Sequence, residues 1–466
     1  MKAAIPRDVS HMLSRREALK LTGGAAVSLP ALAAELAPPD VRLDIAPLVL
    51  EVAPRREVRT TAYNGLAPGP LLRLKEDRPV SIEITNRTDR PEVLHWHGLF
   101  LPPAIDGAIE EGTPAIAPGA SVRYTLTPAP AGFRWYHSHA MAMGELTRGL
   151  YSGQHGMVMI EPRVDPGHYD QECFLALEDW DARLTANEDG AMNPAYPVST
   201  INGKVLGAGE PLRVSEGQRL LLHVLNSSPS EVHWIALAGH DLKVVALDGN
   251  PVPTPRTVPM LRLAPAERVC AIVEMNNPGV WILGEVRRHV QARGMAMIVE
   301  YGGRAGAPRW LQPADLVWSY RQFAAAAAVE PTQAAILVPL VFEAKFRGHG
   351  AMEGWTINGK AYPDAGIAPL IEGRRYRLQF INQSADDHPL HLHRHNFELC
   401  TLGKPFGRPT PAAAEDVRGV MKDVVLVDAR TMTEVEFTAD HPGATLFHCH
   451  QQSHMDLGFM MLIRYA

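Results

Sequence analysis

The sequence predicts an all-β protein built from three consecutive β-sandwich domains. The chain of 466 residues contains 39 Pro and 38 Gly, many at short intervals, which indicates a turn-rich architecture. Between these turns, apolar and polar residues alternate in short runs, as they do in half-buried strands. One order of turns and strands occurs three times, and this repeat sets the number of domains.

Each copy of the repeat begins with an Asn-Gly turn and continues through an extended run, an acidic turn and an alternating strand that ends in Asn. A strand carrying a histidine follows. The three copies start at Asn64, Asn202 and Asn358 and reach their histidines at His95, His233 and His391. Their spacing of roughly 140 to 155 residues matches the size of one β-sandwich.

We therefore expect domains at residues 40–165, 166–305 and 335–466, with a linker at 306–334. The linker contains two Trp and an alanine run, so we expect it to cross the surface, to include a short helical piece and to pack against a domain. The middle copy has Ile235 where its siblings have a second His. Without this second His it is predicted to be structural and to bind no metal ion.

Composition narrows the class of partners. Hydrophobic residues make up 46% of the chain and charged residues 21%, which describes a soluble globular protein with a large core. The net charge of −6 favours neither nucleic acid nor an anionic membrane as a partner. Because no uninterrupted apolar stretch is long enough to span a bilayer, we expect no transmembrane segment.

The N-terminus carries an export pattern. Arg15-Arg16 precede a modest apolar run and an A-x-A-type cleavage site at Ala31-Leu32-Ala33. Residues 1–33 resemble a twin-arginine signal peptide, with Ala18 where such signals more often have Phe. The resemblance implies recognition by the twin-arginine export machinery and a periplasmic or exported bacterial product. The alternative is an amphipathic helix that stays attached.

Four short motifs of histidine and cysteine mark the first and third domains. Side chains alternate along a strand, so the two His of a His-x-His motif face the same way and can chelate one metal ion or bridge two. The motifs are His95-Trp96-His97, His137-Ser138-His139, His391-Leu392-His393 preceded by His388, and His448-Cys449-His450 followed by His454. A thiolate with two imidazoles suits a blue-copper centre. The alternative is a packed Cys among surface histidines.

The other three cysteines have no histidine beside them in the sequence. Cys173, Cys270 and Cys400 lie in short apolar runs and are predicted to be small buried side chains rather than ligands. The sequence leaves open whether any of them forms a disulfide.

The histidine motifs make the whole mature chain look like a three-domain multicopper oxidase of the laccase group, built from cupredoxin-like Greek-key β-sandwiches. The resemblance implies four copper ions. Type 1 copper would bind His388, Cys449 and His454, and type 2 copper would bind His95 and His391. The type 3 pair would bind His97, His137, His139, His393, His448 and His450. The resulting trinuclear cluster would lie between the first and third domains.

One position departs from part of this family. Many bacterial members place an axial Met five residues after the last type 1 ligand, where this chain has Phe459. The pattern is similar to that of high-potential fungal laccases, which have a non-coordinating side chain there. Losing a thioether donor destabilises Cu(II) relative to Cu(I) and should raise the type 1 potential. Met460 is the alternative axial ligand, but strand alternation points it away.

Proton delivery to dioxygen needs carboxyl groups beside the cluster. Asp106 matches the family's acidic residue near type 2 copper, and its alternative role is an ordinary Asp-Gly turn. Asp456 matches an acidic position two residues beyond the last type 1 ligand, and its alternative role is surface solvation. His395 lies two residues after His393 and is a candidate to support a ligand.

The resemblance implies a laccase-like enzyme that oxidises phenols or other small organic reductants by one electron and reduces dioxygen to water. Electrons would enter at His388 or His454 and pass through Cys449 to His448 and His450. A cuprous-ion oxidase for copper tolerance is the second reading. A structural protein of the same fold would lack the ligands, and an electron-transfer cupredoxin would not need the other eight histidines.

Overall fold

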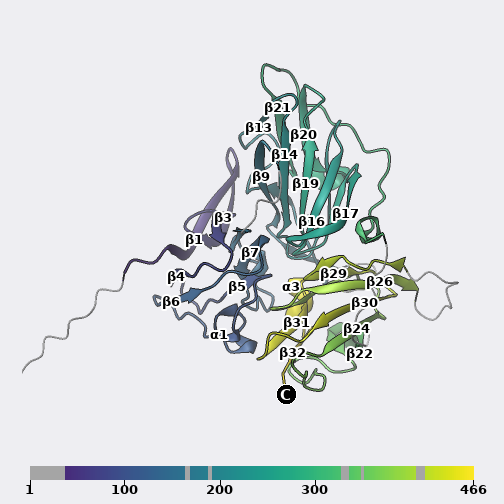
Figure 1. Cartoon of the computed structure of the whole chain (residues 1–466). Helices are drawn as coiled ribbons and strands as arrows, with labels where there is room; N and C mark the ends of the chain where they lie inside the picture. Colours follow the sequence, from purple (N-terminus) through teal and green to yellow (C-terminus); the bar gives the residue numbers. More distant parts are fainter. Residues whose placement is uncertain (1–36, 163–167, 187–191, 327–334, 348–350, 406–414) are drawn as a thin grey trace, which may run out of the picture. The chain divides into compact units, whose positions relative to one another are not determined.

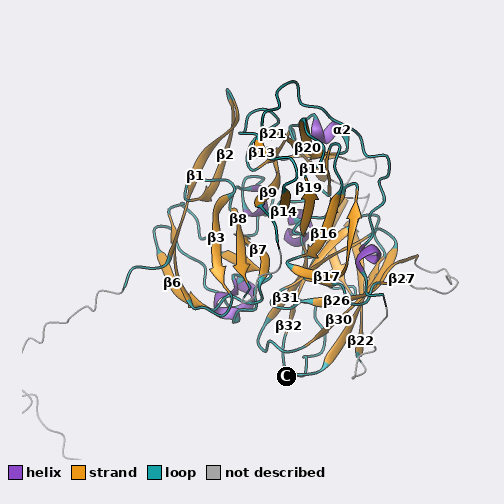
Figure 2. Cartoon of the chain, turned by 45° about the horizontal axis from the view of Figure 1, so that its top comes forward, coloured by secondary structure: helices purple, strands orange, loops and turns teal. Residues whose placement is uncertain are grey.

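The computed structural model describes residues 37–162, 168–186, 192–326, 335–347, 351–405 and 415–466. Strands predominate, and the helices are short (Figure 2). The described strands form seven sheets, and Figure 1 shows their course along the chain. This architecture confirms the predicted all-β class. The export pattern at residues 1–33 lies outside the described residues.

Two four-stranded sheets form the first sandwich, in the orders β2-β1-β4-β6 and β3-β8-β7-β5. Their strands are β1 Val41–Ala53, β2 Arg56–Tyr63, β3 Gly69–Lys75, β4 Val80–Asn86, β5 Leu94–His97, β6 Ser121–Leu126, β7 Gly132–Ser138 and β8 His155–Glu161. In β4, buried residues alternate with half-buried ones, as the sequence pattern predicts. Trp96, Tyr136 and Ile160 lie in the core between the sheets.

The middle sandwich has a six-stranded sheet in the order β12-β9-β14-β19-β16-β17 and a five-stranded sheet in the order β13-β21-β20-β15-β18. The first sheet contains β9 Gln171–Trp180, β12 Val198–Ile201, β14 Arg219–Asn226, β16 Leu242–Leu247, β17 Asn250–Val258 and β19 Arg268–Glu274. The second contains β13 Leu212–Val214, β15 His233–Leu237, β18 Leu261–Leu263, β20 Val280–Glu285 and β21 Ala296–Tyr301. A separate hairpin pairs β10 Arg183–Ala186 with β11 Met192–Ala195.

The third sandwich repeats the plan. One sheet has the order β23-β22-β24-β30-β26-β27, with β28 also paired to β26, and the other has the order β29-β25-β31-β32. The first contains β22 Ile336–Arg347, β23 Ala351–Ile357, β24 Arg375–Asn382, β26 Phe397–Pro405, β27 Glu415–Asp416, β28 Met421–Lys422 and β30 Thr431–Thr438. The second contains β25 His388–Leu392, β29 Val424–Val427, β31 Thr445–Cys449 and β32 Met460–Ile463.

Short helical turns connect the strands. They are α1 Pro103–Asp106, η2 Ile109–Glu111, η3 Gly149–Tyr151, α2 Arg288–Gln291, η4 Tyr320–Phe323 and α3 Gln452–Asp456. The 3-10 turn η4 falls in the predicted linker, where Ser319 caps it. Trp310 and Trp318 of the same segment are partly buried against the hydrophobic core. The expected domain boundaries stay a prediction.

The Asn that opens each copy of the repeat performs the same task three times. Asn64, Asn202 and Asn358 adopt left-handed backbone angles, with φ of 53°, 51° and 53°, which Asn tolerates better than most residues. Each side chain then bridges the first long strand of its sandwich. Asn202, for example, accepts from the backbone N–H of Ala176 at 2.8 Å and donates to the carbonyl of Phe174 at 2.9 Å. The three copies of the repeat therefore share the same pair of hydrogen bonds between the Asn side chain and the backbone of a strand.

The middle repeat keeps its histidine but surrounds it with carboxylates. His233 is fully buried, with Nε2 at 2.9 Å from Asp179 and Nδ1 at 3.1 Å from Glu285. Burial alone lowers the pKa of His233, but the charge of Asp179 and the hydrogen bonds to both carboxylates outweigh it and raise the pKa to about 9. This imidazole is a cation at neutral pH and offers no free lone pair.

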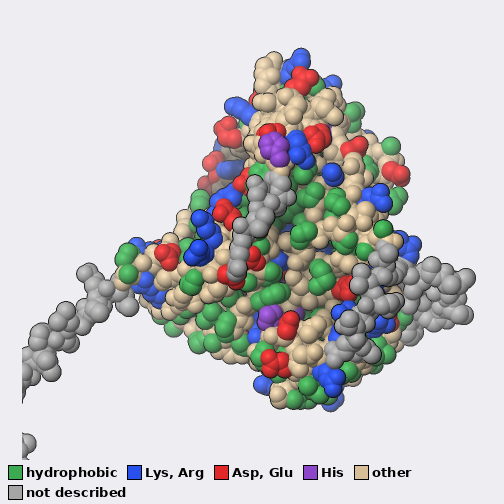
Figure 3. Space-filling model, viewed as in Figure 1, with side chains coloured by type: hydrophobic (Ala, Val, Ile, Leu, Met, Phe, Trp, Pro, Cys, Tyr) green, Lys and Arg blue, Asp and Glu red, His purple; other side chains and the backbone are tan. Residues whose placement is uncertain are grey.

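Charged side chains of both signs are interspersed over the face in Figure 3. Among the described residues, no helix combines the length and the apolar character needed to cross a bilayer.

We predict that His233→Gln lowers the free energy of unfolding by about 3–5 kcal/mol at pH 7, because Asp179 and Glu285 stay buried without their cation. The wild-type contribution is fully present below the unfolded pKa of about 6.5 and disappears as pH rises through about 9. Thermal melts at pH 6.5 and pH 10 check this. A difference in Tm between the two proteins that does not shrink with rising pH would contradict it.

Candidate metal centres

Two strands of the first sandwich carry four of the predicted ligands. β5 and β7 pair antiparallel, with His95 opposite His137. His97 and His139 extend the same faces, and all four rings are buried. Trp135 packs on the His137 ring with 4.1 Å between centroids, so bulky neighbours hold the imidazoles in place.

Two strands of the third sandwich carry the other motifs. β25 and β31 pair antiparallel, with His391 opposite His448 and Leu390 opposite Cys449. Strand alternation therefore sends His448 and Cys449 to opposite faces, as predicted.

The histidines of the two sandwiches interleave. His95 stacks on His393 with 3.9 Å between ring centroids, and His97 stacks on His391 at 3.8 Å. The structure thus brings together eight buried imidazoles from four motifs, namely His95, His97, His137, His139, His391, His393, His448 and His450. Residues some 300 positions apart in the sequence form one cluster.

In several of these imidazoles one ring nitrogen is hydrogen-bonded, and the other has no partner among the described residues. Nδ1 of His95 is 2.9 Å from the carbonyl of Asp106, and Nδ1 of His391 is 2.8 Å from the carbonyl of Asp423. The Nε2 atoms of His95, His137 and His391, and Nδ1 of His97, have no hydrogen-bond partner. Buried polar atoms without partners are costly unless a ligand satisfies them.

Burial also sets the charge of these rings. It lowers the pKa of His95 to about 4 and that of His448 to about 3, and it holds the pKa of His139 and His450 well below the usual value. All are neutral at pH 7, which is the form that binds a metal ion. The donor set of neutral imidazoles with inward lone pairs therefore fits copper.

A second, smaller group lies on the other side of β31. The Cys449 sulfur is 3.7 Å from Nδ1 of His388 and 3.5 Å from Nδ1 of His454, and the two nitrogens are 3.2 Å apart. One metal ion can contact all three atoms at this spacing. Burial raises the pKa of the Cys449 thiol, so metal binding there must release a proton.

Aromatic residues enclose this sulfur site. The Phe459 ring lies 4.8 Å from the His388 ring, and Trp355 lies 4.4 Å from His454, measured between centroids. Met460 packs elsewhere, in a cluster with Ala108. Phe459 thus occupies the position beside the sulfur site, and its side chain offers no donor atom.

Asp106 lies at the edge of the eight-histidine cluster. Its carboxylate is 2.9 Å from Nδ1 of His393 and 3.2 Å from Nδ1 of His95. Glu111, which the sequence reasoning missed, is 3.4 Å from the same His393 nitrogen and accepts from the N–H of Leu446 at 2.6 Å. Burial raises the pKa of Asp106 to about 7, and burial together with the Asp106 carboxyl holds the pKa of Glu111 well above its usual range. The pair holds at least one proton at neutral pH.

Asp456 lies in α3, away from the eight rings. It accepts from the N–H groups of Ala142 and Met143, each at 3.0 Å, and from the Gln452 side chain at 2.9 Å. Asp456 therefore ties α3 to a loop of the first sandwich. His395 donates from Nδ1 to the carbonyl of His393 at 3.0 Å, and its Nε2 lies 2.7 Å from the hydroxyl of Tyr465.

Asp423 is the second residue that sequence reasoning missed. It contacts Nε2 of His97 at 3.2 Å and both terminal nitrogens of Arg268 at 2.6 Å, and Arg134 lies at 3.4 Å. All four side chains are fully buried. The only local signal is a charged pair, Lys422-Asp423, at the entrance to an apolar strand. Nothing in the sequence pairs it with Arg268.

Further buried charges surround this pair. Lys422 contacts Asp248 at 2.8 Å and Glu267 at 2.9 Å, and Tyr320 of η4 bonds to Glu267. Arg268 also donates to the carbonyl of Asp248 at 3.1 Å. The first, middle and third sandwiches and the connecting segment all contribute to one ion-pair network.

The cysteines outside the sulfur site are free thiols. Cys270 and Cys400 are buried, as predicted, whereas Cys173 is half-buried. Cys270 differs from the prediction in one respect, because its sulfur lies 3.2 Å from Nδ1 of His223.

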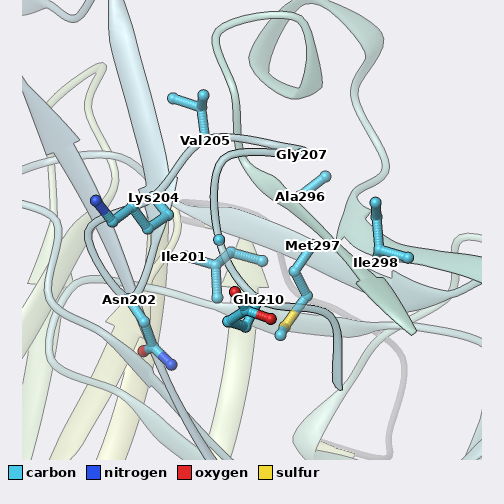
Figure 4. A pocket seen from close by; sticks show the side chains of 10 residues that line it. Ile201, Asn202, Lys204, Val205, Gly207, Glu210, Ala296, Met297 and Ile298 are labelled. Carbon is cyan, nitrogen blue, oxygen red and sulfur yellow. The ribbon is translucent and has the colours of Figure 1, made fainter. Parts of the chain in front are cut away.

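A hollow on the middle sandwich is lined by Ile201, Lys204, Glu210 and Met297 (Figure 4). The Lys204 ammonium turns away to the carbonyl of Glu51. The hollow gathers no set of metal ligands and lies apart from the histidine cluster.

Comparison with known proteins agrees with this geometry. Three multicopper oxidase family models match residues 49–165, 171–303 and 338–466. The chain belongs to the multicopper oxidase family, and it is an oxidoreductase that uses copper and dioxygen. The predicted cupredoxin-like sandwich fold is confirmed.

Three relatives indicate the range of similarity. Multicopper oxidase MmcO of Mycobacterium tuberculosis is 29% identical over 88% of this chain and 83% of its own length. Laccase-4 of Thanatephorus cucumeris is 26% identical over 91% of this chain and 88% of its own length. The crystal structure of a multi-copper oxidase from Pseudomonas thermotolerans is 25% identical, covers 91% of this chain and 98% of that one, and has a TM-score of 0.70.

We predict that Asp423→Asn weakens metal binding by about 10–100-fold, because His97 loses the carboxylate that orients its ring. The change also leaves Arg268 without its buried counter-ion and lowers Tm. Metal analysis after dialysis against a chelator and a thermal melt measure the two effects. Asp428→Asn is the matched control, since its partly exposed pair with Arg262 contributes little. Equal copper retention in both variants would contradict the assigned role of Asp423.

Proposed function

We propose that this protein is a laccase-like oxidase that couples one-electron oxidation of phenols or other small organic reductants to four-electron reduction of dioxygen to water. It would hold four copper ions. His388, Cys449 and His454 would bind type 1 copper, His95 and His391 would bind type 2 copper, and the other six cluster histidines would bind the type 3 pair. The observation that carries the proposal is that one tripeptide, His448-Cys449-His450, contributes to both centres.

With copper bound, the sulfur site would be the place where a reductant delivers electrons. His454 is 7% exposed, whereas His388 is fully buried and its Nε2 is 2.8 Å from the Ser384 hydroxyl. His454 is therefore the edge that meets the reductant. Leu457, which is 41% exposed three residues later, offers apolar contact to an organic ring.

The backbone then connects the two centres. Cys449 joins His448 and His450 directly, and the carbonyl of Cys449 lies 2.9 Å from Nδ1 of His448. This hydrogen bond gives a second short path beside the covalent one. Bound copper supplies the redox chemistry and the binding of dioxygen.

The carboxyl groups beside the cluster move protons. Asp106 acts as the catalytic acid, and Glu111 supports it by holding a further proton next to it. Asp456 is a positioning residue, because the two hydrogen bonds that it accepts from Ala142 and Met143 hold α3, and with it His454, against the first sandwich.

A cuprous-ion oxidase is the second candidate, and one observation favours it. Met141, Met455 and Met460 pack together beside α3, and Met143 is 71% exposed next to them. Thioethers are ligands that Cu(I) prefers.

We further propose export by the twin-arginine machinery to the periplasm or beyond, on the pattern of residues 1–33.

We predict that copper-loaded protein consumes oxygen with phenols and with a non-phenolic dye reductant, and that Cys449→Ser abolishes both activities and the blue colour. The variant should lose one copper of four, because only the sulfur site is broken. Oxygen uptake, visible absorption and metal analysis measure these effects. Cu(I) is the third reductant, and a rate well above that of the phenols would favour the second candidate.

Cys400→Ser is the matched control for this experiment. It removes another buried thiol from the same sandwich but none from the sulfur site, so colour and activity should persist. Oxygen uptake that survives in Cys449→Ser would overturn the electron route. Copper-loaded wild-type protein with neither colour nor activity would overturn the oxidase assignment.

We predict that Phe459→Met lowers the type 1 potential, because a thioether beside the sulfur site stabilises Cu(II). Redox titration of the blue absorption measures the potential. Met460→Leu should leave it unchanged, since Met460 packs against Ala108 and not against the sulfur site. Equal potentials in Phe459→Met and wild type would show that position 459 does not reach the metal.

A further inference from the structure

A cysteine, a histidine and a glutamate lie together on the middle sandwich, outside both metal centres. β9, β14 and β19 are neighbours in one sheet, where His223 pairs with Cys270 on one side and with Phe174 on the other. Leu222 and Val224, at the alternate positions of β14, belong to the sandwich core. His223 and Cys270 therefore face away from that core, and Phe133 of the first sandwich covers them.

The three polar groups form a chain of contacts. The Cys270 sulfur lies 3.2 Å from Nδ1 of His223, and Nε2 of His223 lies 3.3 Å from the Glu172 carboxylate. The Phe174 ring stacks on the imidazole at 4.3 Å, with 15° between the planes. The stacked ring and the carboxylate fix the orientation of His223. A thiol, a base and an acid that orients the base is the arrangement of an activated cysteine nucleophile.

The charges around His223 favour its protonated form. Burial alone lowers the pKa of His223, but the Cys270 sulfur and the Glu172 carboxylate outweigh it and raise the pKa to about 9. The bond from His223 lowers the pKa of Glu172. Arg73 of the first sandwich pairs with Glu172 and keeps it an anion. An imidazolium next to a thiol stabilises the thiolate, which is the reactive form.

The other non-ligand cysteines have no such setting. Burial raises the pKa of both Cys173 and Cys400 to about 12. Cys173 lies on β9, which β14 separates from the strand of Cys270, and it pairs with Leu222, so it packs toward the core and cannot reach Cys270. Cys270 keeps 6% of its surface exposed.

We propose that Cys270 is a modification site, a thiolate activated by His223 and Glu172 that hydroperoxides oxidise to a sulfenic acid. The sulfur attacks one peroxide oxygen, the O–O bond breaks, and the leaving oxygen takes the proton of His223. With hydrogen peroxide the products are Cys270 sulfenic acid, neutral His223 and water. The sulfur loses two electrons and the peroxide gains them. No second thiol lies beside Cys270, so the sulfenic acid persists long enough to be trapped.

The test treats the copper-loaded full chain with hydrogen peroxide in the presence of dimedone, which forms a stable adduct with sulfenic acids, and maps the adduct by mass spectrometry. We expect modification of Cys270 at least tenfold above that of Cys173 and Cys400, which serve as internal controls in the same molecule. His223→Phe keeps a ring to stack on Phe174 but removes the cation. It should reduce the Cys270 adduct about tenfold.

Two further variants separate reactivity from folding. Glu172→Gln should reduce the adduct less than His223→Phe, because Nδ1 still faces the sulfur. Cys270→Ser should abolish the adduct and leave oxidase activity and copper content unchanged, since Cys270 lies outside both metal centres. If His223→Phe does not fold, the comparison of wild type with Glu172→Gln decides. The proposal would be overturned if Cys270 in the folded wild type were labelled no faster than Cys173. It would also be overturned if Cys270 were labelled equally in wild type and in the folded His223 and Glu172 variants.

Discussion

The buried ion pair between Asp423 and Arg268 is the contact on which the arrangement of the metal centres depends. Arg268 belongs to the middle sandwich and Asp423 to the third, while the same carboxylate reaches His97 of the first. Charges buried this deeply are tolerated only when each has its partner in place. The sandwich that carries no ligand motif thus fixes the approach of the two that carry them.

The three repeats show how one backbone position serves different chemistry. The first histidine of the repeat is His95, His233 or His391. In the outer sandwiches burial keeps this imidazole neutral, with a free nitrogen. In the middle sandwich Asp179 and Glu285 occupy both nitrogens, and the ring becomes a cation. In the middle sandwich the two carboxylates hold a protonated imidazole, whereas in the outer sandwiches the corresponding imidazoles are proposed to bind a metal ion.

Strand alternation explains why two centres can share one tripeptide. His448 and Cys449 are adjacent in sequence, yet the pleat sends them to opposite faces of the sheet. The separation between the sulfur site and the histidine cluster is therefore set by covalent geometry rather than by loops. Loops shape the surface near His454 and Leu457, where we propose that the reductant binds.

Periodicity and local chemistry in the sequence by itself determined the all-β class, the repeated Asn-Gly turns, the grouping of metal donors and the opposed directions of Cys449 and its neighbours. Such features follow from the two-residue period of a strand and from the turn preferences of Asn and Gly. Only the tertiary structure decided that Glu111, Asp423 and Arg268 adjoin the cluster, and that Cys270, expected to be a small buried side chain, faces His223. These contacts join strands from distant parts of the chain, and no local pattern encodes them, because pairing between strands depends on the whole fold.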